Sequence, residues 1–127
     1  MKIEKHVEFL GWITEPEKSL VLEHSNLFVM TPTIVGESVE GFGMAFIDAA
    51  FHGVASVGTN SGGIADAIID RETGLLCEPG NQADITEKIR NILTDTSLRE
   101  NFGNKGKEIA NNHYTWQHKI EEYLKEV

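Results

Sequence analysis

The chain has 127 residues, a length that at about 150 residues per domain predicts a single domain spanning residues 1–127. A hydrophobic fraction of 40% and a mean hydropathy of -0.23 are typical of a globular protein, and no apolar run reaches the roughly 18 residues of a membrane span. The net charge of -9 disfavours nucleic-acid binding, which depends on Lys and Arg neutralising phosphates. Cys77 is the only cysteine, and residues 1–5 do not resemble a secretory signal, so we expect a cytoplasmic protein.

The predicted elements alternate between strand and helix along the chain. Short apolar runs predict strands at residues 7–10, 27–30, 54–57 and 74–77. Helices are predicted at 14–25 behind a Thr14/Glu17 capping box, at 43–51, at 64–69, and in three further segments that begin after Asn81, near Leu98 and after Thr115. This order favours an α/β fold, a Rossmann-like parallel sheet with helices on both faces. In such sheets ligands bind beyond the carboxyl ends of the strands.

Two glycine-rich loops carry the unusual residues. In residues 37–44, Gly41 and Gly43 precede a helix that carries Asp48, so uncovered backbone amides and the helix dipole could receive a diphosphate or a sugar hydroxyl. Residues 59–66 again lead from a strand through paired glycines into a helix. Each loop alone has an ordinary interpretation as a tight turn, since short glycine signals are weak.

Taken together, the segments match one family in order and spacing. The matching segments are Glu-Gly-Phe-Gly at 40–43, Asp-Ala-Ala at 48–50, Gly-Val-Ala-Ser-Val at 53–57, Ser-Gly-Gly-Ile-Ala-Asp at 61–66 and Gly-Leu-Leu at 74–76. They resemble the C-terminal, donor-binding domain of retaining glycosyltransferases of family 4, which have the two-Rossmann-domain (GT-B) fold. The resemblance covers about residues 7 to 95.

The resemblance implies a role for each matching residue. The family's hallmark is a pair of glutamates at a fixed spacing: Glu40 matches the first, the catalytic residue that contacts the donor sugar, and Asp48 stands at the second, which accepts from the ribose hydroxyls. The remaining expected contacts to the nucleotide sugar are the backbone of Gly41, Phe42, Gly43 and Met44, the open loop at Gly62 and Gly63, and the base-binding position at Gly11 and Trp12. No cofactor and no metal are expected, because the family is generally metal-independent.

The resemblance also predicts what the chain lacks. Asp48 is one methylene shorter than the family's glutamate, so the ribose contact needs a shift of about 1 Å or a bridging water. The family's basic pair for the donor diphosphate, its first two strands and its acceptor domain have no counterpart in this sequence. We therefore expect the donor half of a larger enzyme, using a UDP-sugar and a glycan or lipid-linked glycan acceptor, in synthesis of O-antigen or capsule, with the full-length protein in the cytoplasm or peripheral at the inner membrane.

Other functions are weighed against this one. A response-regulator receiver suits the length and alternation, but residues 10–13 offer no acidic pair after the first strand. A sugar-nucleotide epimerase of the same architecture would need acid and base groups that this chain does not supply. A binding module with no chemistry of its own stays open, whereas Asp48 and His52 form a weak candidate for a metal site because no third ligand lies nearby.

The resemblance implies that residues 7–10 are a strand without its neighbouring strands. By analogy they are the third strand of a sheet in the order 3-2-1-4-5-6, and residues 27–30 are the fourth. Without the two intervening strands, residues 7–10 must move beside 27–30, stay loose, or pair with another molecule. Because an unpaired apolar edge favours association, we expect self-association of the chain.

Overall fold

The computed structural model describes residues 2–33 and 43–127, built around a parallel sheet in the order β1-β2-β3. The strands are β1 (Phe28–Met30), β2 (Ser56–Thr59) and β3 (Gly74–Cys77). Val29 lies opposite Val57, which lies opposite Leu75. The three predicted strands at 27–30, 54–57 and 74–77 are therefore confirmed, with β2 displaced by two residues toward its carboxyl end.

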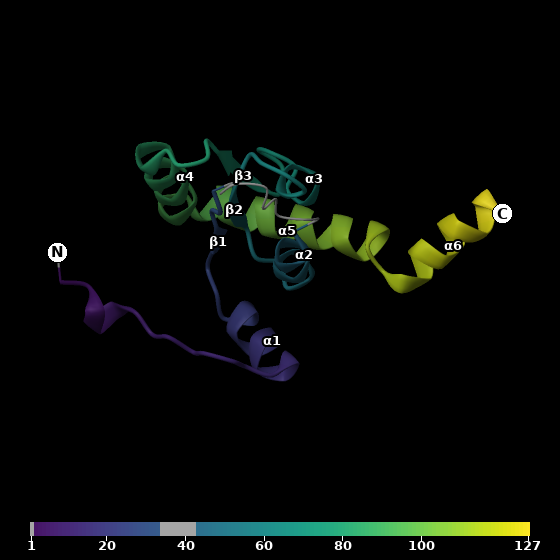
Figure 1. Cartoon of the computed structure of the whole chain (residues 1–127), viewed down its shortest axis with the longest axis horizontal. Coiled ribbons are helices and arrows are strands. Elements are labelled where there is room, and N and C mark those ends of the chain that lie inside the picture. Colours follow the sequence, from purple (N-terminus) through teal and green to yellow (C-terminus); the bar gives the residue numbers. More distant parts are fainter. Residues whose placement is uncertain (1, 34–42) are drawn as a thin grey trace.

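Helices cover both faces of this sheet (Figure 1). The connecting helices α2 (Met44–Phe51) and α3 (Ile64–Ala67) pack on one face, where Phe46 and Ile64 meet Phe28. The opposite face is covered by α4 (Gln82–Thr94) and α5 (Thr96–His113), with a core of Ala55, Val57, Leu75, Cys77, Ile92 and Phe102. This arrangement confirms the expected Rossmann-like α/β class.

The helix starts follow the capping residues of the sequence. α1 (Glu15–Glu23) begins with the Thr14/Glu17 capping box, and its Leu22 packs against Ala49 and Val54. The Asn81 side chain caps α4 by accepting from the amide of Asp84 at 3.1 Å. These side chains satisfy amides that a helix N-terminus leaves without a partner, which is why sequence alone locates them.

The last helix, α6 (Trp116–Glu126), is capped by Thr115 as predicted, but it projects beyond the end of α5 (Figure 1). The periodic pattern of Trp116 and Tyr123 predicts packing residues, whereas their exposed fractions are 85% and 67%. An amphipathic pattern shows which face of a helix is apolar, but not whether this chain covers that face.

The N-terminal segment corrects one prediction. Residues 7–10 form no strand; they follow the short helix η1 (Glu4–His6) as an extended segment that leads away from the sheet to α1 (Figure 1). Phe9 is 95% exposed, so the apolar run does not pack against the described body. A strand needs a neighbour with open hydrogen-bonding groups, and within the described part of the chain, residues 7–10 do not lie beside β1, which pairs with β2 alone. Pairing of this segment with a second molecule stays a prediction.

Candidate functional site

The loops after the three strands lie together at the carboxyl edge of the sheet. The buried Thr59 hydroxyl donates to the carbonyl of Pro32 at 2.9 Å and lies 3.3 Å from the Ser61 hydroxyl. The amide of Asn60 donates to the carbonyl of Cys77 at 2.8 Å. These bonds hold Pro32, beyond β1, and Asn60, beyond β2, beside the last residues of β2 and β3, at the edge where ligands bind in parallel α/β sheets.

The N-terminus of α2 opens at this edge. Gly43 has a φ of 70°, and a Cβ there would lie 3.1 Å from the Phe46 ring, so glycine is required by both backbone conformation and space. No side chain of the described residues caps this N-terminus. The first amides of α2, beginning at Met44, are therefore placed to receive an anionic or hydroxyl oxygen.

Asp48 lies one turn further along α2, on the same face as Met44. Its Oδ2 accepts a hydrogen bond from the Lys18 Nζ of α1 at 3.0 Å, and Lys18 also pairs with Glu15 at 2.8 Å. The hydrogen bonds to Glu15 and then to Asp48 raise the pKa of the Lys18 ammonium, so it stays charged at neutral pH. One oxygen of the carboxylate is thus hydrogen-bonded to α1, while the side chain is partly exposed to solvent.

A cavity of about 610 Å³ adjoins these residues. Its walls come from α2 and from the corner between α5 and α6, and they consist of Met44, Ile47, Asp48, Phe51, Tyr114, Thr115, Trp116 and Lys119. This size is within the range of small-molecule sites, and a mostly apolar wall with few charged groups is their usual character.

The structure brings some predicted site residues together. A Cβ on Gly43 would lie 3.7 Å from the Ile64 Cα, so the start of α2 adjoins the loop of Gly62 and Gly63. Gly43, Met44, Asp48, Gly62 and Gly63 therefore belong to one neighbourhood. Gly62 has a φ of 53°, a conformation that favours glycine, whereas Gly63 has an ordinary φ of -75°.

Other predicted residues are not placed there. Trp12 is fully exposed and Gly11 has open space around it, so the structure does not join this segment to the α2 residues. Glu40, Gly41 and Phe42 lie outside the described residues.

The weak metal candidate gains no partner in the described residues. The Nδ1 of His52 donates to the backbone carbonyl of Asp48 at 2.8 Å. Within the described ranges, no group of three or more His, Cys, Asp or Glu side chains is arranged to hold a metal ion. We also find no helix there that is long and apolar enough to cross a membrane.

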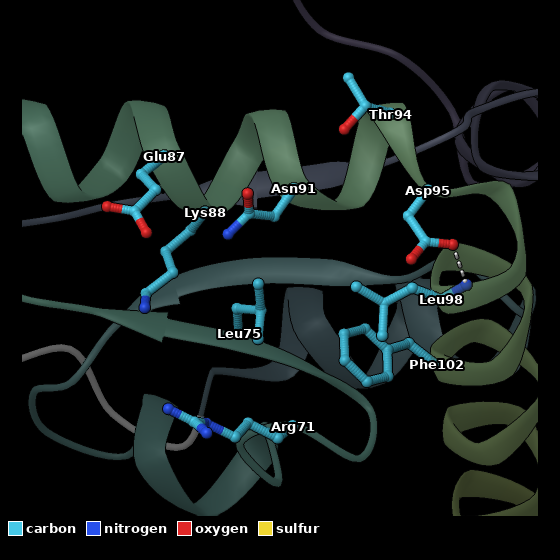
Figure 2. Close-up of a pocket in the computed structure, with 9 residues that line it drawn as sticks. All are labelled: Arg71, Leu75, Glu87, Lys88, Asn91, Thr94, Asp95, Leu98 and Phe102. Carbon is cyan, nitrogen blue, oxygen red and sulfur yellow. Dashed lines mark hydrogen bonds between the residues drawn. The ribbon is translucent and has the colours of Figure 1, made fainter.

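A second cavity of about 580 Å³ lies away from the predicted residues, between β3, α4 and the start of α5 (Figure 2). Figure 2 shows Lys88 and Asn91 of α4 above Leu75, with Arg71 below. One of its two acidic residues, Asp95, caps α5 by accepting from the amide of Leu98 at 2.9 Å. Two acidic and two basic residues line this cavity, so it offers no concentrated positive charge for a diphosphate.

A parallel sheet whose strand ends meet at one edge, a helix N-terminus that no described side chain caps and an adjacent carboxylate are the features of a Rossmann-like domain. The chain belongs to a family of glycosyl transferases, described as glycosyl transferases group 1, whose model matches residues 1–109. This finding confirms the family resemblance drawn from the two glycine loops.

Individual relatives agree with this family. An uncharacterized glycosyltransferase of Methanocaldococcus jannaschii is 30% identical over 112 residues, which are 88% of this chain and 30% of that protein. The capsular polysaccharide biosynthesis glycosyltransferase CapM of Staphylococcus aureus is 37% identical over 78 residues, 61% of this chain and 20% of CapM. The chain thus spans between a fifth and a third of the length of these relatives.

Solved structures share the fold. The crystal structure of HepE from Anabaena in complex with UDP superposes with a TM-score of 0.81 at 23% identity, covering 98% of this chain and 34% of HepE. At 23% identity, this similarity shows a shared fold.

Sequence reasoning missed two groups at the site. Lys18 is 30 positions from Asp48, and no local pattern links them. The helical pattern predicts packing for Trp116 and assigns nothing to Lys119, although a helix that starts directly after a capping Thr115 places its first turn at the corner with α5.

Proposed function

We propose that this chain binds a nucleotide-diphosphate sugar, specifically a UDP-sugar, as the donor half of a retaining glycosyltransferase. The observation that carries the proposal is the position of Asp48: it lies one turn from the start of α2, which no side chain of the described residues caps, and beside the cavity of about 610 Å³. The family of the chain and the UDP complex of the similarly folded HepE support the choice of ligand.

In this proposal the chain's own groups act by position and charge. Asp48 accepts hydrogen bonds from the ribose hydroxyls, and the amides of residues 41–44 receive oxygens of the sugar and diphosphate. When the sugar leaves, negative charge develops on the diphosphate, and the N-terminal dipole of α2 stabilises it. Glu40 contacts the donor sugar near the reacting carbon. We expect the chain alone to bind the donor without transferring it.

The acceptor and the pathway are further parts of this proposal. We place the enzyme in bacterial surface polysaccharide synthesis, with a glycan or lipid-linked glycan acceptor bound by a domain outside this chain. CapM, a relative at 37% identity, acts in capsular polysaccharide biosynthesis according to its name. Such an enzyme would work in the cytoplasm, at the inner face of the membrane that carries its acceptor.

Calorimetric titration of the chain with UDP, GDP and UDP-glucose tests the donor proposal. UDP and UDP-glucose should bind, and GDP should bind more weakly. A folded chain that binds none of these nucleotides would overturn the proposal and favour the alternative, a non-catalytic α/β binding module.

A further inference from the structure

One ion pair crosses between helices at the proposed nucleotide site. The pairs of Lys88 with Asp84, of Lys105 with Glu108 and of Lys119 with Glu122 each join residues three or four positions apart on one helix. Lys18 and Asp48, in contrast, are 30 positions apart and connect α1 to α2. A pair of this kind fixes the position of a carboxylate relative to a second helix.

The geometry leaves half of the Asp48 carboxylate open. Lys18 contacts Oδ2, and within the described residues Oδ1 has no hydrogen bond. The side chains of Lys18 and Asp48 are 35% and 38% exposed, so a ligand can reach the carboxylate without breaking the pair. His52 does not contact this carboxylate: its Nδ1 donates to the backbone carbonyl of Asp48 at 2.8 Å.

We propose that Lys18 is a positioning residue of the nucleotide site: it holds Asp48 so that Oδ1 accepts from the ribose hydroxyls. This inference rests on the proposed function. Asp48 has one rotatable bond fewer than a glutamate and a shorter reach, so the direction of its carboxylate decides whether it meets the ribose. A carboxylate that is already held loses less conformational freedom when the ligand binds.

Glu15 lies beside this pair, in the first turn of α1. It binds the same ammonium at 2.8 Å, and the Thr14/Glu17 capping box fixes where that turn begins. Glu15 is 85% exposed, however, and the Lys18–Asp48 contact does not pass through it. Glu15→Gln is therefore a matched control that removes the neighbouring charge pair and leaves the contact to Asp48.

The test compares the affinities of UDP and 2′-deoxy-UDP by calorimetric titration of the chain. Lys18→Met should lower the affinity for UDP by about three- to tenfold, toward the lower end of the coupling between neighbouring residues, and change the affinity for 2′-deoxy-UDP little. Lys18→Arg should restore the preference for ribose. Glu15→Gln and Lys105→Met, which removes a surface pair of α5, should leave both affinities unchanged. In an Asp48→Asn background, Lys18→Met should have no further effect.

The outcomes separate this inference from the proposed function. A wild-type chain that does not bind UDP would overturn both. If the Lys18→Met variant binds UDP with the same ribose preference as the wild-type chain, the role of Lys18 is overturned and the proposed function stands. This holds whatever the change in thermal stability. Tighter UDP binding by Lys18→Met would also overturn it, because Lys18 would then compete with the ribose for Asp48.

Discussion

At the scale of single residues, Asp48 is the side chain on which the proposed site depends. It stands on a well-packed helix between the buried Ile47 and Ala49, so its backbone is held while its carboxylate faces solvent. This arrangement suits a residue that recognises a ligand, because the core positions it and it contributes little to the core.

The first prediction concerns this carboxylate. Charge-assisted hydrogen bonds contribute about 1.5–3 kcal/mol, so Asp48→Ala should weaken UDP binding by about tenfold or more. The parent chain should also bind 2′-deoxy-UDP more weakly than UDP. Asp66→Ala, which removes an exposed carboxylate of α3, is the control and should bind as the parent does. Equal affinities of the parent for the ribose and deoxyribose forms would contradict the assignment.

The second prediction concerns Glu40, which lies outside the described residues. This prediction rests on the family resemblance. In the complete enzyme, Glu40→Gln should lower turnover on the order of a hundredfold, the effect of removing one electrostatic contact at a reacting centre, with UDP affinity little changed. Glu37→Gln in the same segment is the matched control, since the resemblance assigns it no role. Unchanged turnover in Glu40→Gln would remove that residue from the site.

At the scale of elements, the packing of α5 against α2 decides where the site can form. Two glycines in the middle of α5, Gly103 and Gly106, differ sharply in the space around them. A Cβ on Gly103 would lie 2.1 Å from the backbone carbonyl oxygen of Gly53, just after α2. A Cβ on Gly106 would meet Ala50 and Thr73 at 3.6 and 3.7 Å, which are ordinary contact distances.

The third prediction follows from this contrast. Gly103→Ala should lower the free energy of unfolding by about 1–3 kcal/mol, because the backbone of the Gly53 turn must move. Gly106→Ala should leave it unchanged or raise it by up to about 1 kcal/mol, because alanine favours helix more than glycine does. Urea unfolding followed by circular dichroism measures both. A destabilisation of the same size in the two variants would show that the close approach at Gly103 is not what limits the packing.

At the scale of the whole molecule, apolar surface is exposed at several places. β1 pairs only with β2 in the described sheet, and its Val29 is 40% exposed. Phe9 and Trp12 of the N-terminal segment are exposed, as is the apolar face of α6, and Figure 1 places these two ends on opposite sides of the sheet. An open strand edge with exposed apolar groups favours association.

The fourth prediction is that the isolated chain self-associates through this edge. Because the Phe28 amide donates to Ala55 at 2.9 Å, the alternation of a strand turns the Val29 amide toward the open side. Sedimentation should show species larger than a monomer, and the Val29 amide should gain protection from hydrogen exchange as concentration rises. A monomeric profile together with fast exchange of the Val29 amide at every concentration would count against association.

The sequence by itself determined the local features. The Thr14/Glu17 capping box and the Asn81 and Thr115 caps depend on neighbours a few positions apart, and each appears in the structure as predicted. Three of the four predicted strands also form, with β2 displaced by two residues. Local sequence also determines that Gly43, Met44 and Asp48 lie close together, because they occupy the N-cap and the first two turns of one helix, α2. The family also followed from contiguous motifs.

Only the tertiary structure decided what depends on residues distant in the chain. The Lys18–Asp48 pair, the bond from Thr59 to Pro32 and the corner that brings Trp116 beside α2 join segments that no local pattern relates. The apolar run at residues 7–10 and the stripe of α6 show the converse: their patterns are those of packed elements, yet both are exposed. Periodicity and propensity describe what a segment is suited to, whereas a strand or an apolar face is completed only when other parts of the chain supply its partners.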